Sequence, residues 1–309
     1  MRRDFTFKVA ELVFTVVFED DKDPLCDQLQ QYIPFLMECQ GEPDFKLNVL
    51  SPQSNNDSAE KNCSYNPIMG FEDGGIAFKI EKESISGSYK ISYRTDSVPH
   101  NNSIVTMDAD FKNCILHTTG NSNSRLFGLN NALMMFFAFY GANKNILLFH
   151  ASVIKHQGKG YLFLGKSGTG KSTHTSLWLK HIENAELLND DNPVVGISKE
   201  GKLMVYGSPW SGKTPCYKND KAEIGGFVRL SQAPYNKIER LSTLKAYAAL
   251  LPTVSCMKWE RHLSDGINRT LNSLITTVPV FFMECLPDKD AAQTTFETLT
   301  QQEQENDVG

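Results

Sequence analysis

The positions of apolar and polar residues at the start of the chain follow the period of two that favours β-strands. Residues 5–18 are rich in Phe and Val and partly alternate, which predicts one bent strand or a pair of strands. Residues 75–119 contain three β-like segments separated by Gly, Ser, Asn and Pro, and these predict an antiparallel meander. The polar stretch 51–67 has almost no apolar periodicity, so we expect a long surface loop there.

The period changes at Asn121 to that of a helix. Leu129, Leu133 and Phe136 recur at helical spacing, behind Asn and Ser residues that can cap the start of a helix. Residues 1–140 therefore predict a β-rich N-terminal unit that is closed by a buried helix.

Two apolar segments joined by a polar turn with two glycines predict a β-hairpin after this helix. The register that pairs Lys155 with Tyr161 sets His150 opposite Lys166. His150 is then expected beside the turn that follows the second strand. An isolated histidine on a strand also has a purely structural interpretation, so the residues alone leave its role open.

The remaining segments complete the expected organisation. Residues 278–287 predict a buried strand, and Asp288 can cap a final helix. We expect an α/β core over 141–290, followed at 291–309 by a C-terminal helix whose tail frays after Leu299.

A glycine-rich turn lies between the strand at 161–164 and the next helix, and it completes the pattern G-x-x-x-x-G-K-S. In such a phosphate-binding loop, or P-loop, glycines let backbone N–H groups converge on phosphate oxygens, and the helix N-terminus adds positive potential. The lysine reaches the β- and γ-phosphates and the serine hydroxyl ligates Mg²⁺. The predicted residues of this nucleotide site are Gly165, Lys166, Ser167, Gly168, Thr169, Gly170, Lys171, Ser172 and Thr173.

Two adjacent carboxylates, Asp190 and Asp191, end an apolar strand directly after the helix that begins at Lys171. A strand, helix, strand unit of this length brings them near the phosphate loop. Two carboxylates there can divide the work of a kinase, one holding Mg²⁺ and the other accepting the proton of an attacking hydroxyl. The alternative is an exposed Asp-Asp-Asn-Pro turn that merely ends a strand.

The sequence GKSGTGKST at 165–173, the Asn-Asp-Asp at 189–191 and the strand around His150 together resemble the HPr kinase/phosphorylase family. They resemble ATP-dependent phosphoenolpyruvate carboxykinase more distantly. The resemblance covers residues 145–230 and implies a P-loop core of the HPr kinase/phosphoenolpyruvate carboxykinase type. It implies that Asp190 is the general base, assisted by His150, and that Asp191 is a metal ligand.

Departures from the family pattern concern the acceptor. Thr173 stands where HPr kinases have Glu, and residues 1–140 do not look like their N-terminal domain. In size and pattern the chain is closer to small HPr-kinase-like proteins, some of which phosphorylate serine or another hydroxyl. These departures argue against HPr itself as the acceptor, and the small relatives indicate a serine or another hydroxyl.

A second group of candidates lies downstream. Lys213, in the loop at 207–213, can add a cation to the transferring phosphoryl group. Trp210 in the same loop either faces nucleotide or substrate, or is an ordinary packed side chain. Arg229 is a further cation candidate, and it fits equally well as an exposed residue of a strand.

Composition narrows the class of protein. The 309 residues carry a net charge of −5, which argues against a general nucleic-acid or anionic-membrane partner. The longest apolar run, 132–140, is far shorter than the roughly 20 residues of a membrane-spanning helix. The seven cysteines are scattered and never form C-x-x-C, so we expect a cytoplasmic protein without a zinc site.

Together these features predict a Mg²⁺-ATP-dependent phosphotransferase acting on a hydroxyl of a protein, a peptide or a small molecule. Three alternatives stay open: a nucleotide-responsive binding protein without transfer activity, a hydrolase or phosphorylase, and a carboxykinase-like enzyme. The sequence also leaves the oligomeric state open, with a homo-oligomer among the alternatives.

Overall fold

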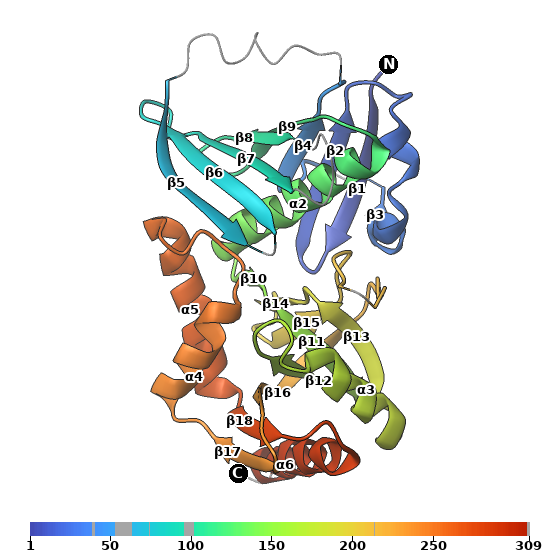
Figure 1. Cartoon of the computed structure of the whole chain (residues 1–309), viewed down its shortest axis with the longest axis vertical. Helices are drawn as coiled ribbons and strands as arrows, with labels where there is room; N and C mark the ends of the chain where they lie inside the picture. Colours follow the sequence, from blue (N-terminus) through green and yellow to red (C-terminus); the bar gives the residue numbers. More distant parts are fainter. Residues whose placement is uncertain (39–40, 53–63, 74, 96–101, 213, 308–309) are drawn as a thin grey trace. The chain divides into compact units, whose positions relative to one another are not determined.

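The computed structural model describes the chain as far as Asp307, apart from residues 39–40, 53–63, 74, 96–101 and 213 (Figure 1). It is a mixed α/β protein with two large sheets and few helices. The chain is divided into two compact units. The N-terminal unit comprises Met1–Lys8 and Leu12–Tyr140, and the C-terminal unit comprises Val9–Glu11 and Gly141–Gly309. No helix among the described residues is both long and apolar enough to cross a membrane.

The N-terminal unit contains a nine-stranded sheet of order β3-β1-β2-β4-β9-β8-β7-β6-β5. Strands β5 to β9 are antiparallel to one another, whereas β4 pairs in parallel with β2 and β9. The elements are β1 (Arg3–Val9), β2 (Leu12–Phe18), the 3₁₀ helices η1 (Pro24–Asp27) and η2 (Gln30–Phe35), β3 (Leu36–Met37), β4 (Phe45–Val49), β5 (Tyr65–Asp73), β6 (Ile76–Glu83), β7 (Tyr89–Thr95), β8 (Ser103–Met107) and β9 (Asn113–Thr118).

Residues 5–18 form a pair of strands, β1 and β2, which is one of the two arrangements that the sequence predicts. The predicted meander is also confirmed, but it contains more strands than expected. Its last segment forms both β8 and β9, because Asp108 accepts hydrogen bonds from the backbone of Lys112 and Asn113 and so closes a turn. Strand β5 was not predicted. It includes the end of the expected loop at 51–67, most of which lies outside the described residues.

Helix α2 (Ser122–Ala142) confirms the predicted buried helix. Its start is capped by Asn121, whose side-chain oxygen accepts a hydrogen bond from the backbone N–H of Ser124 at 2.9 Å. Phe136 of the helix packs edge-on against Phe45 of β4, with ring centroids 5.4 Å apart. Aromatic packing between one helix and one sheet therefore makes the core of this unit.

The C-terminal unit contains a second nine-stranded sheet, with the order β10-β14-β15-β16-β12-β11-β13; β18 lies beside β16, and β17 beside β18. Its elements are β10 (Ile146–Leu148), β11 (Ala151–His156), β12 (Lys159–Leu164), α3 (Lys171–His181), β13 (Glu186–Asp191), β14 (Val194–Ile197), β15 (Leu203–Tyr206), β16 (Lys221–Gln232), β17 (Lys237–Arg240), α4 (Thr243–Leu250), the 3₁₀ helix η3 (Leu251–Thr253), α5 (Arg261–Thr277), β18 (Val280–Cys285) and α6 (Lys289–Asp307). Strands β12, β16 and β18 are parallel, so their carboxyl ends lie along one edge.

The predicted hairpin forms from β11 and β12, but its predicted register is wrong by one residue. Lys155 pairs with Gly160 rather than Tyr161. The reason is a two-residue turn in which Gln157 and Gly158 both have positive φ, 47° and 81°. The first strand of the predicted hairpin is also interrupted at residues 149–150. The part before the interruption is β10, which pairs with β14, and the part after it is β11.

Helices α3 and α6 pack with the sheet around a cluster of buried aromatic and aliphatic side chains. Trp178 of α3 is fully buried there, and its indole N–H donates to the Thr295 hydroxyl of α6 at 2.8 Å. Asp288 caps α6 as expected, accepting from the backbone N–H of Ala291 at 2.9 Å. The helix then continues to Asp307, past Leu299, where the sequence predicts a frayed tail.

Candidate functional site

The glycine-rich loop connects the end of β12 to the start of α3. Gly165 and Gly170 have φ of 155° and 99°, conformations that L side chains rarely adopt. A Cβ on Gly165 would lie 2.3 Å from the Thr169 hydroxyl, which donates to the backbone oxygen of Lys166 at 2.8 Å. The glycines are therefore needed for the turn itself. The side chains of Lys166 and Ser167 are exposed, so the rim of the loop is open to solvent.

Lys171, the first residue of α3, turns its ammonium group back into the loop. Its Nζ lies 3.0 Å from the backbone oxygen of Gly165, 3.4 Å from that of Lys166 and 2.9 Å from Nε2 of His150. The side chain is only 8% exposed. Burial lowers the pKa of Lys171, while the carboxylates of Asp191 and Asp190 oppose that shift. An ammonium group thus lies where the loop can receive an anion.

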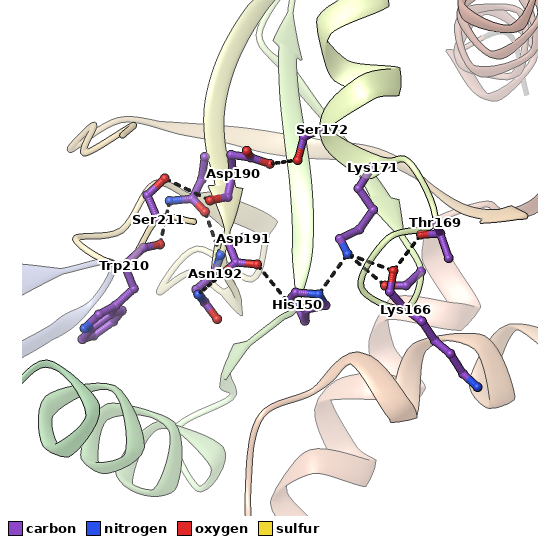
Figure 2. A network of polar contacts seen from close by, with 12 residues as sticks. His150, Lys166, Thr169, Lys171, Ser172, Asp190, Asp191, Asn192, Trp210 and Ser211 are labelled. Carbon is purple, nitrogen blue, oxygen red and sulfur yellow. Dashed lines mark hydrogen bonds and ion pairs between the residues drawn. The ribbon is translucent and has the colours of Figure 1, made fainter. Parts of the chain in front are cut away.

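His150 connects the loop to the strand that carries the two aspartates (Figure 2). Its Nδ1 lies 3.1 Å from Oδ1 of Asp191, and both side chains are 36% exposed. Because a lysine ammonium can only donate, the contact with Lys171 makes Nε2 of His150 an acceptor and leaves the ring proton on Nδ1. Burial alone would raise the pKa of Asp191, but the hydrogen bonds from His150 and Asn192 and the charge of Lys171 lower it.

Asp190 faces a different partner. Its Oδ1 accepts a hydrogen bond from the Ser172 hydroxyl at 3.0 Å, and its side chain is buried. The carboxylates therefore pair as Asp190 with Ser172 and Asp191 with His150. The family resemblance implies the opposite pairing, with Asp191 beside Ser172 and Asp190 beside His150.

The backbone at the aspartates is strained and firmly held. Asp191 has φ of 117°, which costs a residue with a side chain about 1 to 3 kcal/mol. The backbone oxygen of Asp190 accepts from the N–H of Gly212 at 2.7 Å and from the hydroxyl of Ser211 at 2.9 Å. Asn192 donates to Oδ2 of Asp191 at 2.9 Å. The loop after β15 thus holds the backbone of Asp190, and Asn192, directly after β13, holds the carboxylate of Asp191.

Asn189 is the centre of this support and is fully buried. Its amide nitrogen lies 3.2 Å from the Ser208 hydroxyl and 3.4 Å from the backbone oxygen of Trp210, and its oxygen accepts from the N–H of Asn192 at 3.0 Å. Sequence reasoning missed the roles of Asn189, Ser208 and Ser211. The available signals were the place of Asn189 in the Asn-Asp-Asp at 189–191 and its position directly after the apolar residues of the strand.

The downstream candidates are distributed differently. Trp210 is 4% exposed, which favours the interpretation as a packed side chain. Arg229 is exposed on β16, in register with Leu164 at the end of β12. Lys213 lies outside the described residues. Thr173 is exposed on the first turn of α3, two residues beyond Lys171.

Among the residues that the structure describes, no three His, Cys, Asp or Glu side chains converge as a metal site made by protein alone. Oxygen ligands from one hydroxyl and one carboxylate are present in the pair of Ser172 and Asp190. Mg²⁺ sites in phosphoryl-transfer proteins use one or two such ligands, completed by phosphate and water oxygens. The donor set of this pair therefore fits Mg²⁺ held together with a phosphate ligand.

Comparison of the chain with models of known protein families, and with curated proteins, gives no significant match. The site is therefore interpreted from its own residues.

Proposed function

We propose that the chain is a Mg²⁺-ATP-dependent phosphotransferase with a P-loop core of the HPr kinase type, which transfers the γ-phosphoryl group to a hydroxyl. The acceptor hydroxyl belongs to a protein, a peptide or a small molecule. The observation that carries the proposal is the continuous set of contacts at the mouth of the glycine-rich loop. Lys171, His150 and Asp191 form one branch of it, and Ser172 with Asp190 forms the other.

Phosphate binding is supported by the loop and its lysine. Lys171 is buried against two backbone oxygens and a histidine, all of which a phosphate oxygen can replace as its partners. Glycines at 165, 168 and 170 leave the backbone open to close approach. Positioning and electrostatic stabilisation are most of what phosphoryl transfer requires of a protein.

Ser172 and Asp190 are the residues that would hold Mg²⁺. When bound, the ion neutralises charge on the phosphate oxygens. This allotment differs from the one that the family resemblance implies, in which Asp191 holds the metal. The contact between Ser172 and Asp190 at 3.0 Å is the reason for the change.

His150 is then the proton acceptor, and Asp191 orients it. Once Lys171 turns toward phosphate, Nε2 of His150 is released to accept a proton while Nδ1 stays bonded to Asp191. The acceptor hydroxyl gives its proton to Nε2, its oxygen bonds to the γ-phosphorus, and the bond from that phosphorus to the leaving ADP oxygen breaks. The His150 side chain is partly exposed to solvent, which suits this task because the substrate must be able to reach the base.

The direct test incubates a lysate or a peptide library with the protein, Mg²⁺ and ATP whose γ-phosphate carries an oxygen isotope label, and searches for labelled phosphate by mass spectrometry. His150→Ala and Asp191→Asn should lower transfer by about 10²-fold or more while nucleotide binding persists. Asp190→Asn should instead raise the Mg²⁺ concentration needed for half-maximal transfer. Asp220→Asn, a carboxylate paired with Lys155 away from the loop, is the matched control.

A different result would change the conclusion. If ATP binds but neither labelled transfer nor ATP loss occurs, and if the wild-type protein and His150→Ala behave alike, the chain is a nucleotide-responsive binding protein. If only ATP loss occurs, hydrolysis is the activity. If the Mg²⁺ requirement shifts in Asp191→Asn rather than in Asp190→Asn, the roles of the two carboxylates return to those implied by the family resemblance.

A further inference from the structure

Arg229 lies on the face of the C-terminal sheet that points away from α3. Val228 and Leu230, on either side of it in β16, belong to the buried cluster that includes side chains of α3 and α6. Successive side chains of a strand point to opposite faces, so the Arg229 side chain points the other way. Because Arg229 pairs with both Leu164 of β12 and Phe282 of β18, it lies in the interior of the sheet.

A charged residue is unusual at such a position, because strands inside a parallel sheet are usually apolar on both faces. The neighbours of Arg229 follow that rule, since Leu164 is fully buried and Phe282 is partly buried. The Arg229 side chain is nevertheless exposed, and its guanidinium group makes no hydrogen bond or ion pair with any other residue that the structure describes. Glu284, on the same face of β18, instead accepts from the Tyr235 hydroxyl at 3.1 Å. The guanidinium group is therefore available to an anion from outside the protein.

The proposed proton acceptor lies on the same face of the sheet. Phe227, two residues before Arg229 on β16, packs against Phe149, with ring centroids 6.0 Å apart. His150 follows Phe149 directly and bonds Asp191. The proton acceptor and the arginine are therefore at the same edge of the sheet, where the parallel strands end and open α/β sheets bind ligands.

One row of paired residues joins the two groups. Asp191 of β13 pairs with Ala151 of β11. Ala151 pairs in turn with Leu164 of β12, which pairs with Arg229. Three strand spacings of about 4.8 Å put roughly 14 Å between the backbones of Asp191 and Arg229. A ligand at this edge can therefore contact His150 with one group and Arg229 with another that is less than about 14 Å away.

The proposed metal ligands lie on the other face, beside α3. Asp190 bonds Ser172 of α3, and its partner in β11, Ser152, donates to the Thr175 hydroxyl of α3 at 3.1 Å. Arg229 is thus on the side of the proton acceptor rather than on the side of the metal. This placement assigns it to the molecule that gives up a proton, and not to the nucleotide.

We propose that Arg229 binds an anionic group of the acceptor, so that the acceptor is a hydroxyl compound that also carries a carboxylate or a phosphate. The inference rests on the proposed function, because it takes His150 as the proton acceptor. An arginine binds either anion through two parallel hydrogen bonds from its planar fork. In an extended peptide, at about 3.3 Å per residue, the anionic group lies within about four positions of the reactive serine. A free hydroxy acid offers the same two groups in one small molecule.

The first measurement is the chemistry of the acceptor. Acceptors labelled in a lysate by isotope-marked ATP are identified by mass spectrometry, and each should carry a carboxylate or a phosphate at that spacing. Two pairs of probes are assayed beside them: serine peptides with Asp or Asn at the neighbouring positions, and glycerate with glycerol. The charged member of the accepted pair should have a kcat/KM at least about tenfold higher. The pair that is accepted distinguishes a peptide from a small molecule.

Variants at Arg229 give the second measurement. Arg229→Gln should raise the KM for the charged acceptor by about tenfold or more and leave the KM for ATP unchanged. Arg229→Lys keeps a cation without the planar fork and should recover part of the affinity. Arg269→Gln, at an exposed arginine of α5, is the matched control and should behave as the wild-type protein does.

The outcomes separate this inference from the proposed function. Transfer to acceptors without an anionic group overturns the inference and leaves the proposed function standing. A loss in Arg229→Gln that falls on the KM for ATP has the same meaning, because it assigns the arginine to the nucleotide. Binding of ATP without transfer to any acceptor overturns the proposed function, and the inference falls with it. The acceptors labelled by the wild-type protein decide the question even if a variant fails to fold.

Discussion

Charged groups in the two units are used in opposite ways. In the N-terminal unit, Arg125 of α2 and Asp23 form a bidentate ion pair in which both side chains are buried. In the C-terminal unit, Asp191 and His150 remain 36% exposed, and Lys171 approaches them from the loop. One pair is closed to solvent and ligands, and the other is open to both.

The difference indicates how charged groups that stabilise the fold can be distinguished from charged groups that take part in a reaction. A buried pair satisfies its own groups, and removing one partner leaves the other uncompensated. The open pair is only partly satisfied by its surroundings. Asp191 keeps a strained backbone conformation, and its neighbour Asn192 is held by the buried side chain of Asn189. Stability should therefore depend on the closed pair, and activity on the open one. Four measurements test this, from the largest expected effect to the smallest.

The closed pair should give the largest loss of stability. Asp23→Ala leaves the Arg125 guanidinium buried without its carboxylate, so the free energy of unfolding should fall by about 3 to 5 kcal/mol. Urea unfolding followed by circular dichroism measures this. Replacing Asp23 with Leu and Arg125 with Met together should recover much of the loss, and a loss below about 1 kcal/mol in the single variant would refute the idea.

A buried neutral histidine gives a pH-dependent effect of intermediate size. Burial lowers the pKa of His174 from its ordinary value of 6.5 to about 4, and Nε2 lies 3.0 Å from the Thr295 hydroxyl. The unfolded chain therefore binds a proton that the folded chain does not, between pH 6.5 and 4. The contribution of neutral His174 to the free energy of unfolding is fully present above pH 6.5. It is lost as the pH falls to 4, which lowers the free energy of unfolding by roughly 3 kcal/mol in total.

This prediction is checked by unfolding in urea at a series of pH values in the wild-type protein and in His174→Gln, which keeps a hydrogen-bonding group toward Thr295. The difference between the two curves isolates His174 from the carboxylates that titrate in the same range. Parallel curves would show that His174 is not held neutral.

The buried support of the open pair should have a smaller effect on stability and a visible effect on activity. Asn189→Ala leaves the N–H of Asn192 and the Ser208 hydroxyl without their amide partner, which should cost about 2 kcal/mol. Asn192→Ala is the matched control, because that side chain is only partly buried. Both unfolding and the rate of transfer are measured. Equal losses in the two variants would argue against Asn189 as the central support.

Backbone strain at Asp191 should give the smallest effect, and its sign is diagnostic. Elsewhere a change from Ala to Gly usually lowers stability, because the unfolded chain gains freedom. At φ of 117° glycine avoids a conformation that alanine tolerates poorly, so Asp191→Gly should be about 1 kcal/mol more stable than Asp191→Ala. Thermal or urea unfolding of the two variants compares them directly, and the opposite order would mean that the backbone is not strained.

The sequence predicts those parts of the molecule that depend on local patterns. The period of two in residues 5–18 and the helical period after Asn121 lead directly to β1, β2 and α2. Strand β5 escapes prediction because Pro67 and Gly70 interrupt its pattern. An edge strand tolerates proline, since its outward N–H groups pair with nothing in the sheet. The hairpin register fails because the sequence does not specify that the turn contains only two residues.

The same division holds at the candidate site. The loop from Gly165 to Ser172 is recognisable because its chemistry is contained in one continuous motif. The pairing of the aspartates is not, because neighbouring residues on a strand normally point to opposite faces and the unusual φ of Asp191 alters its direction. The support from Asn189 joins residues on β13 to a distant loop, and no local pattern reports such a contact.

The hydroxyl of Thr295 has a consequence for the order in which the protein is built. It binds both Trp178 and His174 on α3, the helix that carries Lys171 and Ser172 at its start. Translation produces α6 after every other element of the C-terminal unit, whereas the N-terminal unit has all its strands and its helix long before. Domains fold as units during synthesis, N-terminal first. On the ribosome, the N-terminal unit can therefore fold before α6 is synthesised. Until then, the helix that begins at Lys171 lacks its contacts with Thr295.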